Sequence, residues 1–441
     1  MREMKDSGIE WIGEIPDDWE TKPLKSIVRF GKGLPITKEN LIEQGIPVVN
    51  YGQIHSKLNN GTHLQKELIR FVSEQYLESN PTSLGKKGDI FFADTSEDYD
   101  GIGNAVLIDI DAPVFAGYHT VMVRPEDQLY SRYLAYLFLT DAWRSQLRSR
   151  ASGIKVFSVT QGLLKKTTVI LPPIEKIVSM TDYLDRKCSQ IDAIIARQQE
   201  VIEKLKAYKL SVITEAVTKG LNPDVPMKDS GIKWISKIPE HWENRKMISI
   251  LSMRVVDGPH ESPELYDDGI PYISATAIEN GKINFDLMRG YISEEYCDIC
   301  DLRYKPQLYD ILVIKLGAST GQAAIVETTK RFNIWVPLAA VRCNEEADPY
   351  FVYYAFQSDY FLKQMEMSWT YGTQQTLGVK TIERLRIMLP SLNEQKQIVC
   401  YLKSKCNSID ESITHKQNII DKLTDYKKSL IYEVVTGKKE V

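Results

Sequence analysis

Polar side chains gather beside glycines in two separate parts of the chain. Amide, hydroxyl and cationic groups of this kind reach base edges and phosphates, and glycine lets backbone approach a ligand closely. A single loop glutamine is more often simply solvated, so the prediction of DNA contact depends on the concentration of such residues. The segments are RFGKGLPITKEN, NYGQIHSK and ASGIKVFSVTQG in the first part, and SATAIENGK, IKLGASTGQ and WTYGTQQTLGVK in the second. The candidate DNA-binding residues are Lys32, Tyr51, Gln53, His55 and Lys155, and then Ser274, Thr276, Lys315, Ser319, Gln322, Tyr371, Gln374, Gln375 and Lys380.

The sequence carries none of the common catalytic signatures. It has no G-x-x-x-x-G-K-[ST] phosphate loop, no G-x-G-x-x-G between a strand and a helix, and no Asn-Pro-Pro-aromatic segment. Its six histidines are scattered without metal-ligand or triad spacing. Cys297 and Cys300 form one C-x-x-C without a second pair at zinc spacing, which favours ordinary thiols over a zinc or redox site. We therefore expect no catalytic residue, no metal and no cofactor on this chain.

The elements that must position the polar loops are repeated. MKDSGIEWIGEIPDDWE, residues 4–20, returns as MKDSGIKWISKIPEHWE, residues 227–243. A second repeat closes each half, at residues 171–220 and 389–438. The two centres between them diverge, so the chain is a tandem duplication in which the ends were kept and the centres changed. The two halves are joined by the linker LNPDVP, residues 221–226, whose prolines end the preceding helix.

Each closing repeat predicts one long helix with a coiled-coil seam. Apolar residues recur at alternating steps of four and three, which is the a/d spacing of paired helices. Gln198 and Lys209 in the first copy, and Lys416 and Lys427 in the second, are polar seam positions that can fix register. An ordinary amphipathic helix packed on its own domain is the alternative, but two equal seams favour mutual pairing. The apolar seam residues are Ile191, Ile195, Ile202, Leu205 and Val212, and then Ile409, Ile413, Ile420, Leu423 and Leu430.

The divergent centres share one mixed α/β pattern. GDIFFA at residues 88–93 corresponds to YDILVI at 309–314, and both runs are typical of strands. Helical periodicity follows in residues 133–147 and 351–365, and each centre ends in an apolar strand that leads into the long helix. The predicted divisions are 1–170 and 227–388 for two globular domains, 171–220 and 389–441 for the two helices, and 221–226 for the linker.

Bulk composition limits the class of protein. The 441 residues are 43% hydrophobic and 26% charged, as expected of globular domains, and no run of eighteen apolar residues predicts a membrane span. Six cysteines are too few for a disulfide framework, and the N-terminus is not a signal peptide, so we expect a cytoplasmic protein. The formal net charge of −4 does not by itself indicate nucleic-acid binding, so local patches or partner subunits would have to supply the positive field if the chain binds DNA.

The ordered pair of motifs, present twice, resembles the specificity (S) subunit family of type I restriction–modification enzymes. The resemblance covers nearly the whole chain and depends on SGIEWIGEIPDDWE and SGIKWISKIPEHWE, followed by LPPIEKIVSMTDYLDRKCSQID and LPSLNEQKQIVCYLKSKCNSID. The first copy departs slightly at residues 175–178, where the second keeps Glu394, Gln395 and Ile398.

The resemblance implies a division of labour between subunits. Each centre would be a target recognition domain that reads one half of a split sequence in double-stranded DNA. The two helices would pair antiparallel and set the spacer. Two modification subunits would bring S-adenosylmethionine and adenine methylation, and motor-nuclease subunits, with ATP and magnesium, would join for restriction. A duplicated protein-binding scaffold without a nucleic-acid role, or an enzyme with an unfamiliar site in its loops, are the alternatives.

Overall fold

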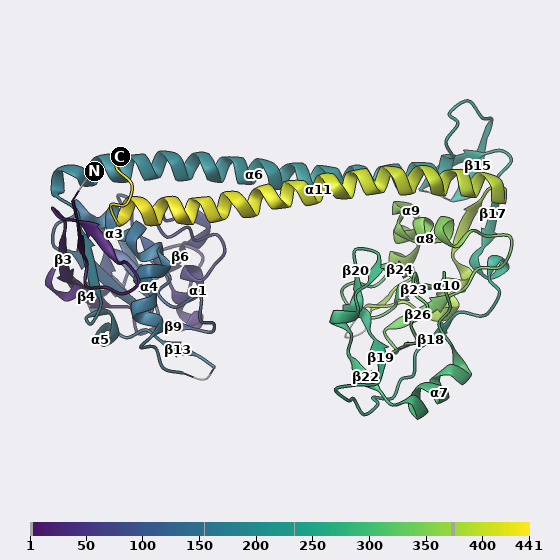
Figure 1. The fold of residues 1–441 in the computed structure, drawn as a ribbon, viewed down its shortest axis with the longest axis horizontal. Helices are drawn as coiled ribbons and strands as arrows, with labels where there is room; N and C mark the ends of the chain where they lie inside the picture. Colours follow the sequence, from purple (N-terminus) through teal and green to yellow (C-terminus); the bar gives the residue numbers. More distant parts are fainter. Residues whose placement is uncertain (1–2, 154, 233, 372–374) are drawn as a thin grey trace. The chain divides into compact units, whose positions relative to one another are not determined.

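The computed structural model describes residues 3–153, 155–232, 234–371 and 375–441 (Figure 1). Contacts within the chain divide it into two compact units. The first unit comprises residues 1–198 and 418–441, and the second comprises residues 199–417. Each unit therefore combines one divergent centre with a part of each long helix.

Two four-stranded sheets form the centre of the first unit. Their strands are short, and most of their residues are buried or half-buried and are β-branched or aromatic, which suits a pleated core. One sheet has the order β10 (Ala105–Leu107), β8 (Ile90–Ala93), β12 (Thr120–Pro125) and β4 (Val28–Lys32). The other has the order β6 (Arg70–Val72), β5 (Ile46–Val49), β11 (Val114–Ala116) and β7 (Leu84–Gly85).

Short strand pairs and helices complete the first unit. The pairs are β1 (Met4–Asp6) with β2 (Glu14–Pro16), β3 (Glu20–Pro23) with β14 (Thr168–Leu171), and β9 (Thr95–Ser96) with β13 (Phe157–Ser158). The helices are α1 (Tyr51–Ile54), α2 (Tyr76–Ser79), α3 (Tyr130–Leu139), α4 (Asp141–Arg148) and α5 (Gln161–Leu164).

The second unit repeats this plan in reduced form. Its main sheet has the order β18 (Val256–Asp257), β26 (Leu338–Val341), β23 (Ile311–Ile314) and β24 (Ala323–Ile325). A three-stranded sheet has the order β22 (Gly290–Ile292), β19 (Ile270–Ile273) and β25 (Asn333–Ile334). The strand pairs are β15 (Met227–Ile232) with β16 (Ile235–Pro239), β17 (Glu243–Lys246) with β29 (Arg386–Leu389), β20 (Ile278–Glu279) with β21 (Lys282–Ile283), and β27 (Thr370–Tyr371) with β28 (Gln375–Thr376). The helices are α7 (Glu294–Arg303), α8 (Pro349–Gln357), α9 (Asp359–Glu366) and α10 (Val379–Arg384).

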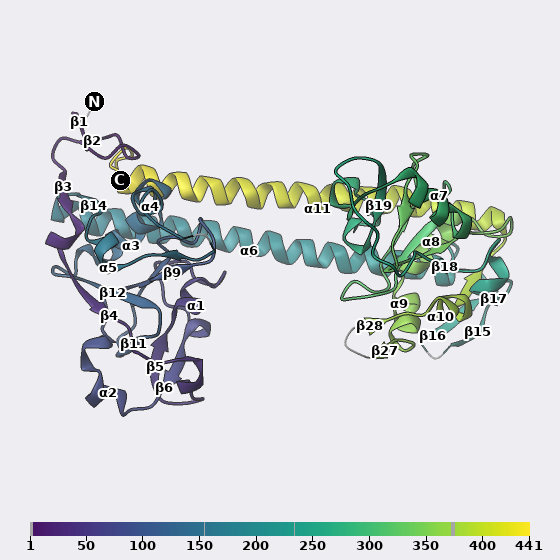
Figure 2. The same ribbon diagram turned by 90° about the horizontal axis from the view of Figure 1, so that it is seen from below.

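The closing repeats are the long helices α6 (Ile174–Lys219) and α11 (Leu392–Val435), which lie side by side in both views (Figures 1 and 2). They run antiparallel. In the first unit Lys427 Nζ lies 2.7 Å from Asp192 Oδ1, and in the second unit Lys209 Nζ lies 2.7 Å from Asp410 Oδ2. Every predicted seam position, apolar or polar, is buried or half-buried. The predicted fold, a duplicated α/β chain with an antiparallel coiled coil, is confirmed.

Both long helices end at a glycine in the left-handed region. Gly220 follows α6 with φ of +75°, and Gly437 follows α11 with φ of +69°. A Cβ atom there would lie 3.3 Å from a ring carbon of Trp242 in the first case and 3.0 Å from one of Trp19 in the second. Both tryptophans are buried. The opening repeat therefore supplies the wall against which each helix ends.

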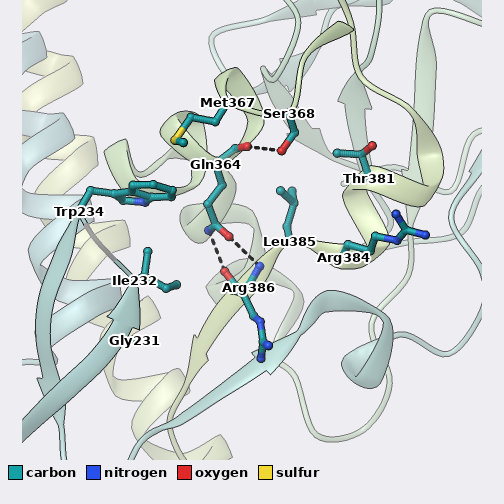
Figure 3. A pocket seen from close by; sticks show the side chains of 10 residues that line it. All are labelled: Gly231, Ile232, Trp234, Gln364, Met367, Ser368, Thr381, Arg384, Leu385 and Arg386. Atoms are coloured by element: carbon teal, nitrogen blue, oxygen red, sulfur yellow. Dashed lines mark hydrogen bonds between the residues drawn. The ribbon is translucent and has the colours of Figure 1, made fainter.

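Two consecutive short helices precede the last strand of each centre, α3 and α4 in the first unit and α8 and α9 in the second. A buried glutamine in the second helix of each pair bonds to the strand that leads into a long helix. Gln364 in α9 donates to the Arg386 carbonyl at 2.9 Å and accepts from the Arg386 N–H at 2.8 Å (Figure 3). Gln146 in α4 makes the same two bonds to Thr168, at 2.9 and 2.8 Å. One side chain thus satisfies both backbone groups of an edge residue.

Candidate nucleic-acid interface

The sheet β10-β8-β12-β4 of the first unit corresponds strand by strand to the sheet β24-β23-β26-β18 of the second unit. In the first unit one row of paired residues runs Ala105, Phe92, Val121 and Lys32. In the second unit the corresponding row runs Ala323, Val313, Ala339 and Asp257. Lys32 therefore corresponds to Asp257. By the same register, Asp94 after β8 corresponds to Lys315 after β23.

In each unit a short turn connects the two sheets beside these strand ends. It joins β11 to β12 in the first unit and β25 to β26 in the second. In the first unit the Gly117 N–H donates to the Val49 carbonyl at 2.8 Å, and the Asp94 N–H donates to the His119 carbonyl at 3.0 Å. In the second unit the Trp335 and Lys315 N–H groups donate to the carbonyls of Ile273 and Pro337, at 2.9 and 2.8 Å. We call the ends of these strands, together with the turn, the recognition edge.

Glycine lets the backbones approach each other at the recognition edge. A Cβ atom on Gly33 would lie 1.9 Å from the Gly117 carbonyl oxygen, and one on Gly258 would lie 2.2 Å from that of Ile334. Neither position tolerates a side chain without backbone movement. Gly33 in the first unit and Gly258 in the second are thus both needed to close the edge, although only Gly33 lies in one of the polar segments singled out from the sequence.

His119 and Asp94 are the central polar pair of the first recognition edge. His119 Nδ1 lies 3.1 Å from Asp94 Oδ1, and since a carboxylate only accepts, Nδ1 is the donor. This bond leaves Nε2 available to a ligand. His119 has φ of +53°, an uncommon conformation for a residue with a side chain, and it contacts the ring of Tyr51 edge-on.

Two pockets adjoin this pair and bring predicted residues together. One of about 610 Å³ is lined by Lys32, and another of about 650 Å³ is lined by Tyr51 and His55. His119 and Thr95 line both. The second pocket also has Glu97, Asp98 and Asp100 on its wall.

The remaining predicted residues of the first unit differ in availability. Gln53 Oε1 accepts from the N–H and the amide of Asn50, at 3.3 and 3.1 Å. His55 uses both ring nitrogens, with Nε2 2.7 Å from the Thr95 carbonyl and Nδ1 3.1 Å from the Asn104 amide. The placement of Gln53 and His55 therefore gives no support to their prediction as DNA contacts. Lys32 and Lys155 are exposed.

Lys315 is also engaged within the protein. Its side chain is 8% exposed, and Nζ lies 2.7 Å from Oδ2 of Asp257, which is 9% exposed. Asp257 also receives His260 Nε2, at 3.1 Å, and the guanidinium of Arg303. Burial alone would raise the pKa of Asp257, but the hydrogen bond and charge of Lys315, with His260 and Arg303, hold it below its usual value. The prediction that Lys315 contacts DNA therefore finds no support in its placement.

The other predicted residues of the second unit lie around the same strand ends. Ser274 is buried at the start of a short 3₁₀ helix, and Thr276 in that helix is exposed and donates to the Leu287 carbonyl at 3.1 Å. Ser319 and Gln322 are exposed in the loop after β23. Gln375 accepts the Gly317 N–H through its carbonyl at 3.2 Å, which joins its segment to that loop, and Lys380 is exposed on α10. Gln374 lies outside the described residues, and of Tyr371 only the backbone is described, in β27.

Sequence reasoning missed five polar residues of the two edges. These are Asp94 and His119 in the first unit, and Asp257, His260 and Arg303 in the second. Asp94 directly follows the strand GDIFFA, so its place at a strand end was accessible from the sequence. Arg303 is the last residue of α7, a helix that the sequence pattern did not single out. Its partner Asp257 is distant along the chain, so the pair was not visible in the sequence.

A separate pocket of about 550 Å³ lies between the opening repeat of the second half and the end of the second centre, rather than at the recognition edge (Figure 3). Ile232 and Trp234 of the opening repeat line it, together with Arg384 and Arg386 near β29. Within the described ranges, no group of three or more His, Cys, Asp or Glu residues is placed to hold a metal ion. No helix in the described parts of the chain is long and apolar enough to cross a membrane.

Comparison with known proteins gives a consistent family. A family model described as the type I restriction modification DNA specificity domain matches residues 16–204 and again residues 239–424. The chain is 20% identical over 439 residues to the type I restriction enzyme EcoKI specificity subunit of Escherichia coli (strain K12), covering 97% of this chain and 90% of that protein. It is 25% identical over 452 residues to the type I restriction enzyme MjaVIII specificity subunit of Methanocaldococcus jannaschii, covering 97% and 94%.

A solved structure supports the same fold. Its subject is described as complex assembly and conformational transition of the type I R-M system. One chain of it matches with a TM-score of 0.68 and 16% identity, over 96% of this chain and 99% of that one. Because the family model matches most of the sequence in two copies, this chain belongs to the type I restriction modification DNA specificity family and is a specificity subunit with DNA-recognition domains.

Proposed function

We propose that each unit reads one half of a bipartite target in double-stranded DNA. The observation that carries the proposal is the repeated recognition edge, which has the same strand ends and turn in both units but different polar side chains. Different side chains on one scaffold suit two related recognition tasks. A protein-binding scaffold is not favoured, since the matching family model is a DNA specificity domain.

The chain works with catalytic partners in this proposal. Two modification subunits, which bind S-adenosylmethionine, dock on the repeated segments, and motor-nuclease subunits, which use ATP and magnesium, join for restriction. The chain itself contributes sequence recognition and no catalytic group. Its net charge of −4 supports this division, because partners then supply much of the positive field around DNA. The paired helices α6 and α11 set the spacer.

Selection from duplexes of random sequence tests the proposal. The chain, alone and co-purified with its modification subunits, is mixed with the library, and bound duplexes are sequenced. We expect the complex to select two short motifs with a fixed spacer, and the isolated chain to bind weakly and with strong salt dependence. Equally tight and specific binding by the isolated chain would contradict the need for partners. Failure of the complex to select any sequence would contradict DNA recognition.

Variants at the two edges test the assignment of half-sites. Lys32→Ala or His119→Ala should relax one motif, and Gln375→Ala or Lys380→Ala only the other. Each lost base contact should cost about 1–3 kcal/mol of discrimination. Relaxation of both motifs by changes in one unit would show that the units do not read separate half-sites.

A further inference from the structure

The second recognition edge holds one buried carboxylate among three cationic or ionisable groups. Asp257 Oδ2 receives Lys315 and His260, and Oδ1 receives Arg303. With Lys315 and Arg303 charged and Asp257 ionised, the cluster has a net positive charge even when His260 is neutral. Both oxygens of the carboxylate are occupied, so the N–H groups of Arg303 that Asp257 does not use remain as donors to a ligand.

Arg303 is the donor best placed to meet DNA. Its side chain is 51% exposed, whereas Lys315 is 8% exposed. Only one terminal nitrogen of its guanidinium bonds to Asp257, and the planar group carries five N–H donors in a rigid fork. The carboxylate therefore orients the fork and leaves N–H groups unspent. A pair of adjacent acceptors matches such a fork, and guanine presents O6 and N7 in this way in the major groove.

A comparison with the corresponding residues of the first unit favours contact of Arg303 with a base over contact with a phosphate. There Lys32 stands for Asp257 and Asp94 for Lys315, so the signs of both charges are reversed. Asp94 is bonded to His119, whose position is taken by Pro337 in the second unit. Phosphates are the same in every half-site, so a scaffold copied with its phosphate contacts has no reason to reverse them. Groups that read different bases must change, and so must the residues that orient them.

We propose that Arg303, held by Asp257 and Lys315, reads a guanine in the half-site recognised by the second unit. This inference depends on the proposed function, since it names a base within one half of the bipartite target. Asp257 and Lys315 are positioning residues here, because they act through Arg303. A buried ion pair is costly to assemble unless its geometry is useful, and orienting a guanidinium is such a use.

The test compares base preferences of matched arginine variants. The complex of the chain with its modification subunits selects duplexes from a random library, using wild type, Arg303→Gln, Arg303→Lys and Arg254→Gln. Arg254 is the control because it is an exposed arginine of the same unit, paired with Glu383 at 2.9 Å. We expect Arg303→Gln to lose the preference for one guanine in one motif by about 5- to 150-fold. Arg303→Lys should lose part of it, and Arg254→Gln should keep it.

Replacement of single guanines by a modified base gives a second measurement, and its first arm uses the wild-type chain alone. Each guanine of the wild-type target is replaced in turn by 7-deazaguanine, which lacks the N7 acceptor. One guanine in one motif should be sensitive with wild type and insensitive with Arg303→Gln. A uniform fall in affinity for Arg303→Gln would indicate a phosphate contact and overturn the proposal. So would relaxation at a base other than guanine, or tolerance of 7-deazaguanine at every guanine. Absence of any bipartite motif with wild type would instead contradict the proposed function.

Discussion

Asp257 makes the stability of the second unit sensitive to acid. Its folded pKa is lowered, because its cationic partners outweigh burial. A carboxyl of this kind contributes stability that is present above its unfolded pKa of about 3.9 and is lost as pH falls through the folded value. We expect the midpoint of urea unfolding of this unit to fall more steeply below about pH 4 in wild type than in Asp257→Asn.

The measurement is the urea midpoint from pH 6 to pH 2, followed by hydrogen exchange in β23 and β26. Asp267→Asn is the matched control, because Asp267 is exposed in the same unit. It should keep the wild-type slope. If Asp257→Asn kept the same acid slope as wild type, the cationic cluster would not stabilise the ionised form.

Single residues were the least predictable part of the candidate site. Lys32 and Lys315 look alike in the sequence, since each stands beside an apolar strand and a glycine. Lys32 is exposed, whereas Lys315 is buried against Asp257, which lies on a different strand. Such a partner is supplied by the sheet register, which a local pattern does not encode. The polarity of the edge was predictable, but the division of its residues between fold and ligand was not.

The long helices were the most predictable elements. Apolar residues at alternating steps of four and three predict which face of the helix is apolar at every turn, and each copy of the repeat gives this prediction separately. The structure adds the partners of the polar seam residues, since Lys209 and Lys427 both reach aspartates on the facing helix. Lys209 is equivalent to Lys427 in the two copies, and Asp192 is equivalent to Asp410. The same antiparallel register therefore forms both Lys–Asp pairs.

The glutamine contacts predict that the two units can be destabilised one at a time. Gln364→Leu leaves the N–H and carbonyl of Arg386 without their side-chain partner, and Gln364 is only 8% exposed. The second unit should lose about 1–3 kcal/mol of stability. Hydrogen exchange should rise in β29 and the start of α11, while β14 keeps its wild-type protection.

Gln146→Leu is the reciprocal variant, because Gln146 makes the same two bonds to Thr168. It should raise exchange in β14 and leave β29 unchanged. Faster exchange of both strands in either variant would mean that the units unfold together. Unchanged exchange in both would mean that water replaces the glutamine bonds without cost.

At the scale of the whole molecule, the duplication was predictable but the membership of the compact units was not. Division of the sequence in chain order places residues 418–441 with the second half, whereas they pack in the first unit. Tyr133 donates to the Val435 carbonyl at 2.8 Å, and Lys438 donates to the Ile12 carbonyl at 2.8 Å. This exchange follows from antiparallel pairing, which returns the end of α11 to the first centre.

We expect the pairing of α6 with α11 to determine the spacer length. Removing residues 195–201 from α6 and 413–419 from α11 takes one heptad from each helix and leaves both Lys–Asp pairs in place. One heptad is about 10 Å of helix, and DNA rises about 3.4 Å per base pair, so the preferred spacer should shorten by about three base pairs. The two half-site sequences should stay the same.

Helical rotation of DNA opposes a clean change of spacer. Three base pairs turn the duplex by about a quarter to a third of a turn, so methylation should fall sharply as well as shift its optimum. Removing the heptad from α6 alone is the matched control, because only one of the two Lys–Asp pairs can then form and the subunit should be destabilised. Methylation of duplexes with spacers of every length measures both effects. An active double-deletion variant with the wild-type spacer preference would show that spacing is set elsewhere, since the shortened seam would still pair while the distance it spans had changed.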